Sequence, residues 1–594
     1  MSAARKLSRK AALCESISNA PQERSTRGNG VRKAGSPGGI WSPIVAARKC
    51  RRSHSKNIEL ASPINRGFSM RYLNRLSLVV PIATASILSI GLAPSNATTL
   101  TIVMESRVSV LDPVVSTAHQ SRNHGYMIYD TLFALDGQGV IRPEMVDNWR
   151  VSDDKKTYTF TLRDGLTWHD GAKVTAEDCV ASIKRWAQQD RMGRALMKYI
   201  TDLRADSEKS FSLTLSIQTD LILAAFAKPS GIPLFMMPKR VAETPVTDPI
   251  TDYTGSGPFK FVAAEFKPGV RAVYVKNESY VPRPEPASGL AGGKVAKVDR
   301  VERVEMADQL SAVNALIKHE IDYLETVPFD LLPMVEGVPG VVVERLDTLG
   351  YQPVYRFNHL HPPFDNKLIR QAAMYAIGQE AALQTQIGNP KYYRTCAAVF
   401  GCGLPYESSA KSEMVIPSNI EKAKSLLKEA GYNGAPVVVL QATDIPLIAS
   451  MPIVIAQHLR EAGFNVELQA MDFMTLLSRR SNRSSVADGG WSLFVTTWHN
   501  TEVQDPVRSF TTTANGKDAW AGWPTVPAIV EATNQFLLAL DEEHRKEIAA
   551  RLQELVIDEG VVGPLGSVTK PVGYSKSISG VLHAPVQVFW NISK

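Results

Sequence analysis

The chain has 594 residues, more than one hydrophobic core usually supports, so two or more domains are expected. Its 44% hydrophobic and 21% charged residues are typical of a soluble globular protein. The net charge is +7, but residues 1–69 hold 14 Lys and Arg against 3 acidic residues, while residues 98–594 hold 50 basic and 56 acidic ones. A nucleic-acid role would rest on the N-terminal segment alone, so we expect no nucleic-acid partner.

Residues 1–69 are rich in Arg, Ser and Gly and show almost no apolar periodicity, so we expect them to be disordered if they are made. A signal peptide works at the very N-terminus of a protein, and the next segment has the features of one. We therefore expect residues 1–69 to be an extension added by an overlong gene start. The alternative is an Arg- and Ser-rich transit peptide.

Residues 70–97 are predicted to be a secretory signal peptide. Two arginines form the basic start, residues 76–93 form the apolar stretch, and Ser95 and Ala97 supply the small residues that a signal peptidase requires. The alternative is a transmembrane anchor. It is disfavoured because a proline and a glycine interrupt the apolar stretch and no basic stop-transfer patch follows. We expect an exported, periplasmic protein.

The segment 157–179, TYTFTLRDGLTWHDGAKVTAEDC, is the most informative part of the chain. Its first residues alternate between apolar and polar side chains as a strand does, and two Asp-Gly steps mark turns, which together predict a hairpin. Thr175 follows as a helix N-cap, with Asp178 three residues later to complete a capping box. Cys179 lies on the apolar face of that helix and is expected to be a buried thiol.

Elsewhere, short apolar runs alternate with helical patterns. Strands are predicted at residues 100–104, 211–217, 437–440, 466–470 and 492–497, and a Gly-rich turn leads into a strand at 254–261. Helices are predicted at residues 310–321, 421–430 and 453–462, the last two ended by glycines. Residues 281–293 are predicted to be a loop. Because helices separate the later strands, we expect a largely parallel sheet with crossover connections.

Four further motifs occur in order: YDTLF from Tyr129, GSGPF from Gly255, HPPFDNKLIRQAAMYAI from His361 and EKAKSLLKEAGY from Glu421. Together with segment 157–179 they closely resemble the signature of the peptide/nickel-type family of extracellular solute-binding proteins. This is solute-binding protein family 5, whose members serve ABC importers. The resemblance spans nearly all of residues 98–594.

The resemblance implies a fold of the α/β class: a two-lobed periplasmic-binding-protein fold with a hinge and an extra subdomain in lobe one. Mapped onto this chain, lobe one comprises residues 98–138, 239–325 and a C-terminal return at 564–594. The extra subdomain comprises residues 139–238. Lobe two comprises residues 326–563.

The resemblance also implies a function. The protein would capture a peptide-like or other polar solute in an interlobe cleft and deliver it to an ABC permease in the membrane. Its partners would be that ligand and the transmembrane and ATPase subunits of the transporter, and the protein itself would be a monomer. Neither catalysis nor a cofactor is expected. The alternative is a secreted hydrolase of unknown substrate.

Enzyme motifs fail on inspection. Residues 292–294 resemble a phosphate-binding loop but lack its first glycine and its following Ser or Thr, and residues 319–320 lack the second histidine of a metalloprotease motif. The sequence contains no GxSxG nucleophile elbow. His359 and His361 could share a metal ion, but a histidine pair before Pro-Pro is more often part of a polar loop. We expect no metal site.

The main candidate ligand residues lie in segment 490–510, where a strand ends at Trp498 and runs into a polar loop. Such strand ends commonly line clefts with an aromatic wall and a few polar groups. Many peptide binders of the family place an aspartate just after this tryptophan to hold the peptide's α-amino group. Here a His-Asn-Thr run follows, and the nearest carboxylates are Glu502 and Asp505. We expect Trp498 to form the wall and Asp505 to help replace the aspartate; alternatively, Trp498 is an ordinary core residue.

Four other residues complete the expected site. Arg356 follows the predicted interlobe crossing and could pair with a ligand carboxylate or form a surface salt bridge. Tyr126 and Arg122 precede the YDTLF motif and could face the cleft from lobe one. Trp523, in an aromatic loop with Trp520, could cap the ligand or pack on lobe two.

Cys396 and Cys402 lie six residues apart. In an oxidising compartment they are expected to form a disulfide that closes a small loop.

We predict that the exported protein begins at Thr98, because cleavage after Ala93 would leave Pro94 next to the scissile bond. N-terminal sequencing of exported protein measures this directly. Recovery of any peptide from residues 1–69 in that material would contradict the overlong gene start.

Overall fold

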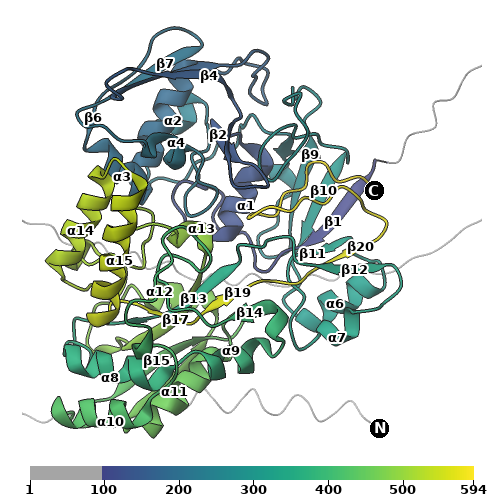
Figure 1. Ribbon diagram of the computed structural model, residues 1–594. Helices are drawn as coiled ribbons and strands as arrows, with labels where there is room; N and C mark the ends of the chain where they lie inside the picture. Colours follow the sequence, from purple (N-terminus) through teal and green to yellow (C-terminus); the bar gives the residue numbers. More distant parts are fainter. Residues whose placement is uncertain (1–96) are drawn as a thin grey trace, which may run out of the picture. The chain divides into compact units, whose positions relative to one another are not determined.

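The computed structural model describes residues 97–594, which form two large β-sheets with helices packed around them (Figure 1). The predictions for residues 1–69 and for the signal peptide lie outside the described residues. Within the part that is described, no helix combines the length and the apolar character needed to span a membrane.

Lobe one is built on a seven-stranded sheet. Its central strand β1 (Thr99–Val103) runs parallel to both neighbours, β10 (Arg300–Val304) and β11 (Tyr323–Leu324). Antiparallel strands extend the sheet on either side: β9 (Arg271–Lys276) and β8 (Phe259–Phe261), then β20 (Val572–Ser575) and β12 (Val341–Glu344). The helices of this lobe are α1 (His119–Ile128), α6 (Gln309–Ile317) and α7 (Leu332–Val335).

Lobe two is built on a second sheet, whose strand order is β14 (Tyr393–Arg394), β19 (Ser567–Val568), β13 (Tyr351–Phe357), β17 (Leu493–His499), β15 (Val437–Ala442) and β16 (Val466–Met471). The short strand β18 (Gly563–Pro564) also pairs with β13. Its helices are α8 (Lys367–Ile377), α9 (Glu380–Ile387), α10 (Ile420–Glu429), α11 (Met451–Glu461), α12 (Phe473–Arg479), α13 (Asn500–Val503), α14 (Pro527–Leu538) and α15 (Glu542–Asp558).

The predicted largely parallel sheet is wrong for lobe two. Strand β15 runs parallel to β16 and β17, but β13 is antiparallel to β17, β18 and β19. The crossover helices that enforce parallel pairing connect only the strands around β15. The chain enters and leaves the lobe through the antiparallel strands.

The extra subdomain carries a four-stranded antiparallel sheet in the order β4 (Val146–Val151), β5 (Thr157–Leu162), β7 (Ser210–Leu215) and β6 (Ile200–Ala205). A hairpin of β2 (Phe133–Leu135) and β3 (Ile141–Pro143) leads into it. Its helices are α2 (Ala176–Gln189), α3 (Arg191–Met197) and α4 (Leu221–Phe226), and α5 (Lys239–Ala242) follows directly after the predicted subdomain. Helices α3 and α14 line a common cavity between the subdomain and lobe two.

The capping box at Thr175 is confirmed: its side chain accepts from the Asp178 backbone N–H, and the Asp178 side chain accepts from the Thr175 backbone N–H. The apolar side chains of β5 are buried and alternate as predicted. Strand β5 pairs with β4 and β7 and not with the residues that follow its Asp-Gly turn. The predicted hairpin is present only as a short one around the second Asp-Gly turn, where Thr167 and Lys173 form an antiparallel bridge.

Helix and strand predictions in lobe two agree with the structure at residues 421–430, 437–440, 453–462, 466–470 and 492–497. The predicted helix at 310–321 ends earlier, at Ile317, and Ile321 is buried in the connection to β11.

Two connections join the lobe sheets. The first lies at residues 345–350, between β12 of lobe one and β13 of lobe two, and the second at residues 569–571, between β19 and β20. Both lie somewhat later than the predicted boundaries at 325/326 and 563/564, because β12 belongs to the first sheet and β18 and β19 to the second. The assignment of whole lobes and subdomain stays a prediction.

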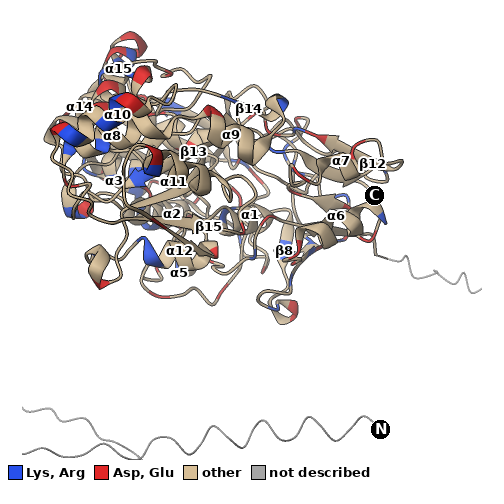
Figure 2. Ribbon diagram, turned by 90° about the horizontal axis from the view of Figure 1, so that it is seen from below, with Lys and Arg blue, Asp and Glu red and all other residues tan. Residues whose placement is uncertain are grey.

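Basic and acidic residues both lie on the outer helices α8, α10, α14 and α15 (Figure 2). No single sign covers that surface, which agrees with the near balance of charge counted over residues 98–594.

Replacing Thr175 by Ala should lower the free energy of unfolding by about 1 kcal/mol, because two reciprocal cap hydrogen bonds are lost. Chemical denaturation of Thr175→Ala beside the exposed loop variant Thr247→Ala tests this. An equal change in both variants would contradict a specific capping contribution.

Candidate functional site

A cavity of about 290 Å³ lies between the two lobes. Lobe one contributes Glu105, just after β1, and residues 115–120, which lead into α1. Lobe two contributes α12, Arg480 and residues 496–498 at the end of β17. The ends of β1 and β17 therefore face one another across the gap, the usual place for a ligand in open α/β sheets.

Three polar atoms of the cavity-lining residues are buried and find no hydrogen-bond partner in the described part of the chain: Glu105 Oε1, Thr497 Oγ1 and Trp498 Nε1. The Arg480 guanidinium lies over the rings of Phe494 and Trp520, 5.8 and 5.3 Å from their centroids. It makes no hydrogen bond or ion pair with residues 97–594, and burial lowers its pKa to about 10. Buried polar groups are normally paired, so these three atoms leave hydrogen-bonding capacity beside the cavity unused.

A second cavity of about 900 Å³ continues from the first and shares Glu105, Ala118, Gln120, Phe473 and Leu477 with it. Its other walls carry charged side chains of both signs: Arg107 and Glu305 from lobe one, Asp444, Asp472 and Arg479 from lobe two. We call the two cavities together the interlobe cleft.

A buried lysine holds Glu105 in place. Lys570 Nζ lies 3.0 Å from Glu105 Oε2 and 3.5 Å from Glu325 Oε1, and the Glu105 backbone N–H donates to Glu325 Oε2 at 2.8 Å. Burial alone would lower the pKa of Lys570, but the two carboxylates raise it well above its ordinary value. The cluster of two carboxylates and one ammonium thus carries a net negative charge beside the cleft.

Glu502 of lobe two forms hydrogen bonds with residues of lobe one and of the extra subdomain. Its carboxylate accepts hydrogen bonds from Ser230 Oγ, from the Gly231 backbone N–H at 2.7 Å and from His119 Nε2 at 3.2 Å. The backbone N–H of His499 donates to it as well, which completes the capping box of α13. Burial alone would raise the pKa of Glu502, but His119, Arg122 and the Ser230 hydrogen bond hold it well below its usual range.

His119 faces both the cleft and Glu502. Burial lowers the pKa of His119 despite the neighbouring carboxylate, so its ring is neutral near pH 7. Because an ionised carboxylate can only accept, the Nε2 atom of this histidine must carry the proton. His119 is the first residue of α1, so this hydrogen bond fixes the first turn of α1 against lobe two.

Trp498 is the predicted ligand residue that the structure brings to the cleft. Its side chain is 6% exposed, stacks on Phe510 with ring centroids 5.9 Å apart and meets Trp520 edge-on at 5.5 Å. One face of this three-ring cluster, Trp498 with Phe510 and Trp520, packs inside lobe two while Trp498 lines the cavity. Trp498 therefore fits both interpretations: it lines the cavity wall, and it also packs on Phe510 and Trp520 in the core of lobe two.

Arg356 has a structural role inside lobe two, where it connects several backbone segments. Its fully buried guanidinium donates to the carbonyls of Thr511, Thr513, Trp520, Ala521 and Val561. These five bonds occupy the donors that a ligand carboxylate would need.

Asp505 is likewise engaged within its own loop. Its carboxylate accepts from the backbone N–H groups of Val507 and Arg508, both at 2.9 Å, and pairs with the Arg508 guanidinium at 2.8 Å. It does not line the interlobe cleft, so the predicted substitute for the amine-binding aspartate is not placed to meet a ligand there.

Tyr126, Arg122 and Trp523 also lie away from the cleft lining. The Tyr126 hydroxyl donates to the Pro229 carbonyl, and Arg122 donates to Asn123 and Ser230. Trp523 packs beside Trp491 with Arg483 4.9 Å above its ring. All three are buried and structural in this arrangement.

Sequence reasoning missed Glu105, Arg480 and His119. Glu105 directly follows the predicted strand 100–104, so its place at a strand end was a usable signal. Arg480 and His119 carry no such mark, because their exposure to the cleft depends on how α12 and α1 pack. Glu502 was noted as a nearby carboxylate, but its role as a bridge depends on Ser230 and Gly231, far away in sequence.

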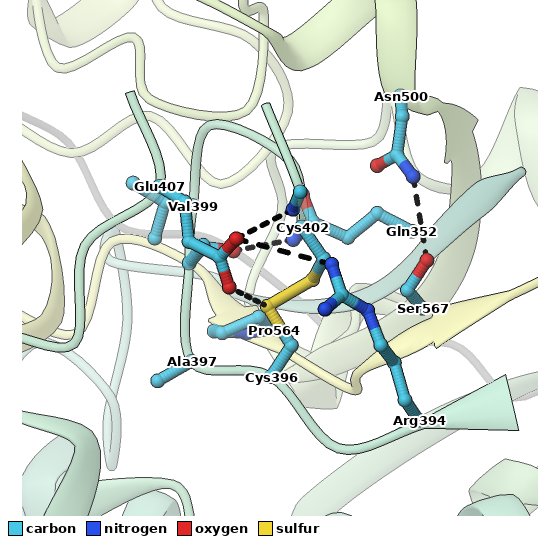
Figure 3. The surroundings of a disulfide bond; sticks show 12 residues. Gln352, Arg394, Cys396, Ala397, Val399, Cys402, Glu407, Asn500, Pro564 and Ser567 are labelled. Atoms are coloured by element: carbon cyan, nitrogen blue, oxygen red, sulfur yellow. Dashed lines mark hydrogen bonds and ion pairs between the residues drawn. A yellow bond between two sulfur atoms is a disulfide. The ribbon is translucent and has the colours of Figure 1, made fainter. Parts of the chain in front are cut away.

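The predicted Cys396–Cys402 disulfide is present, with Cα atoms 6.2 Å apart (Figure 3). Its loop is tied to the lobe-two sheet, where the Ala398 carbonyl accepts from Gln352 of β13, and to α15, where the Val399 N–H donates to Gln553 Oε1 at 2.7 Å. Asn500, the first residue of α13, lies nearby and donates to Ser567 (Figure 3). The bridged loop therefore backs the segment that carries Glu502. Cys179 is a buried free thiol, as predicted.

Residues 140–520 match the family model described as "Bacterial extracellular solute-binding proteins, family 5 Middle". The chain belongs to family 5 of the bacterial extracellular solute-binding proteins. A probable peptide ABC transporter periplasmic-binding protein of Sinorhizobium fredii is 41% identical over 492 residues, covering 82% of this chain and 92% of that protein. A glutathione-binding protein of Escherichia coli K12 is 24% identical, covering 72% and 80%.

Solved structures share the fold of this solute-binding protein. The binding protein AgaA of A. tumefaciens R10, in complex with agropinic acid, aligns with a TM-score of 0.71 at 22% identity, covering 83% of this chain and 98% of that one. DppA of Helicobacter pylori, in complex with the peptide STSA, aligns with a TM-score of 0.69 at 20% identity, covering 84% and 98%. The two-lobed periplasmic-binding-protein fold is thus confirmed.

Family membership makes this protein the solute-binding component of an ABC importer, and the family is one of binding proteins located outside the cytoplasmic membrane. Nothing in the comparisons supports the alternative of a secreted hydrolase.

Glu502→Ala should lower the free energy of unfolding by about 2–3 kcal/mol, because several buried hydrogen bonds are lost at once. The exposed variant Glu429→Ala on α10 is the control. Because the folded-state pKa of Glu502 is depressed, its contribution is present above its ordinary pKa of 4.5 and is lost as the pH falls further. Denaturant titrations at neutral and acidic pH should therefore show the two proteins converging in acid. A difference from wild type that is independent of pH would contradict this assignment.

Proposed function

We propose that this protein captures a small zwitterionic, peptide-like solute in the interlobe cleft, with its ammonium group at Glu105 and its carboxylate at Arg480. The observation that carries the proposal is a pair of charged groups on opposite walls of one cavity: Glu105, whose Oε1 atom lacks a hydrogen-bond partner in the described chain, and Arg480. Glu105 Oε1 belongs to a buried cluster with net negative charge, and Arg480 is a guanidinium without a carboxylate partner in the described chain. A zwitterion complements both walls at once.

The other lining groups suit such a ligand. Trp498 offers an apolar ring face for a side chain and an unpaired Nε1–H for an oxygen. Thr497 Oγ1 adds a hydroxyl that can donate or accept. The 290 Å³ of the inner cavity suits a ligand of one or two amino-acid units, and the adjoining 900 Å³ leaves room for a longer one.

Capture is coupled to lobe closure in this proposal. Because the ligand binds groups of both lobes, it stabilises the closed arrangement over any open one. The two connections at 345–350 and 569–571 are the segments about which the lobes would move. The membrane permease then receives the solute from the closed form.

The names of the relatives favour a ligand of this class. They include a probable peptide-transporter component and glutathione-binding proteins, and the structural neighbours were solved with a peptide and with agropinic acid. The protein would act as a monomer in the periplasm after removal of the signal peptide at residues 70–97. It would release its ligand unchanged, and it would bind no nucleic acid.

A panel of dipeptides, screened by thermal shift and measured by calorimetry, tests the ligand class. For the tightest peptide of the panel, Glu105→Gln should weaken binding about 10- to 100-fold, the effect of losing one charge-assisted bond. The N-acetylated form of that peptide lacks the ammonium group and should bind weakly to wild type. Glu105→Gln should leave this weak affinity unchanged. Arg480→Gln should behave in the same way toward the C-amidated peptide.

Exposed charges provide matched controls: Glu336→Gln in lobe one and Arg150→Gln in the subdomain should bind like wild type. Trp498→Ala should weaken all peptides by about 1–3 kcal/mol, the scale of lost aromatic burial. If Glu105→Gln and Arg480→Gln bind every peptide as wild type does, the proposed orientation is refuted.

A further inference from the structure

A separate cavity of about 480 Å³ lies between the extra subdomain and lobe two. The subdomain contributes the charged face of α3 and its C-cap, namely Arg191, Arg194 and Lys198. Lobe two contributes Phe510, residues 512–515, Asp518, Trp520 and the start of α14. This cavity shares no lining residue with the interlobe cleft, and the three-ring cluster of Trp498, Phe510 and Trp520 stands between them.

Within residues 97–594 the three cations of this cavity form no ion pair with a carboxylate. Arg191 makes no hydrogen bond or ion pair through its guanidinium within residues 97–594, and its Nη1 atom is buried. Burial lowers the pKa of Arg191 to about 10, although Asp505 and Asp190 act in the opposite direction. Those two acids are engaged elsewhere, Asp190 with Lys228 and Asp505 with Arg508. Asp518 is the one carboxylate that lines the cavity.

Further arginines without carboxylate partners in the described chain lie just behind the wall of this cavity. Arg356 is fully buried and binds carbonyls alone, and its pKa is lowered to about 9 by burial and by repulsion from Arg191. Its guanidinium lies 5.3 Å from the centroid of the Trp520 ring, and that of Arg480 lies at the same distance. Two guanidiniums without a carboxylate partner in the described chain therefore lie over one tryptophan, and Arg191 lines the same cavity as that tryptophan.

Such an arrangement is costly unless an anion offsets it. A buried guanidinium has lost its hydration, and carbonyl groups compensate this only in part. Arg191 is not compensated by any carbonyl either, and its side chain faces space large enough for a small molecule. Hydroxyl and amide side chains of Thr512, Thr513, Asn515, Thr533 and Asn534 line the remaining walls, which suits an ion that carries several oxygen atoms.

We propose that the cavity between α3 and lobe two is a second ligand site, which binds a small multivalent oxyanion through Arg191, Arg194 and Lys198. Phosphate groups and polycarboxylates share the required chemistry: two or more negative oxygens that accept from guanidinium and ammonium groups.

This site spans the same lobe contact as the interlobe cleft. Its cations belong to the subdomain of lobe one, and its aromatic and hydroxyl groups belong to lobe two. An anion held there bridges the two parts and favours the closed arrangement. By linkage, the anion and the transported solute strengthen each other's binding, although they do not touch.

Thermal shift and calorimetry with inorganic phosphate and with citrate, each against sodium chloride at matched ionic strength, test the proposal. Wild type should be stabilised by at least one of the two anions. Arg191→Gln should weaken that anion's binding by about tenfold or more, as expected for a lost charge-assisted contact. Citrate or phosphate should also make the wild-type protein more compact in small-angle X-ray scattering.

Lys422→Gln, an exposed cation on α10 without an ion pair in the described chain, is the control and should respond like wild type. If Arg191→Gln does not fold, Lys198→Gln, exposed at the end of α3, takes its place and should show the same loss. A response to citrate alone or to phosphate alone supports the site and identifies the favoured group. The proposal is overturned if neither anion binds, or if Arg191→Gln and Lys198→Gln bind it as tightly as wild type.

Discussion

Lys570 determines how the two lobes meet. Its ammonium group is buried between the carboxylates that follow β1 and β11, and it lies 4.6 Å from the centroid of the Tyr351 ring at the start of β13. One cation thus contacts the ends of two strands of lobe one and the first strand of lobe two. Removing a charge from water costs several kcal/mol unless partners surround it, so these three ends are held together. The carboxylate that faces the interlobe cleft has its position from this contact.

Each side of the lobe contact carries charge that the protein does not balance internally, which explains why charged ligands would bind there. Lobe one has one carboxylate too many around Lys570, and lobe two has guanidiniums without carboxylates around Trp520. Arg480 and Glu105 do not pair in the described structure. A core built for stability alone would have neutralised these groups internally, as Asp190 and Lys228 do. Charge that is not balanced on either wall is expected of a surface that binds charged solutes.

Local structure was predictable from the sequence because its causes are local. Thr175 and Asp178 cap their helix through bonds three residues apart, and helices α8, α9, α10 and α11 of lobe two end at or next to glycines. Strand pairing was not predictable in this way, since β5 finds its partners on both sides of a long insertion. The site was partly predictable: Trp498 marks a strand end. Arg356 could not be assigned, because a guanidinium that meets five carbonyls looks the same in sequence as one that meets a ligand.

Lobe two is inserted into lobe one, and its two ends meet, because Tyr351 pairs with Val568 across β13 and β19. The last strand of the first sheet, β20, comes after the whole of lobe two in the chain and separates β11 from β12. As the polypeptide emerges during synthesis or export, lobe two can complete its own sheet from contiguous chain. The sheet of lobe one stays incomplete between β11 and β12 until residues 572–594, which begin with β20, have been made. A polypeptide truncated near its C-terminus would therefore keep one half in order and leave the other unfinished.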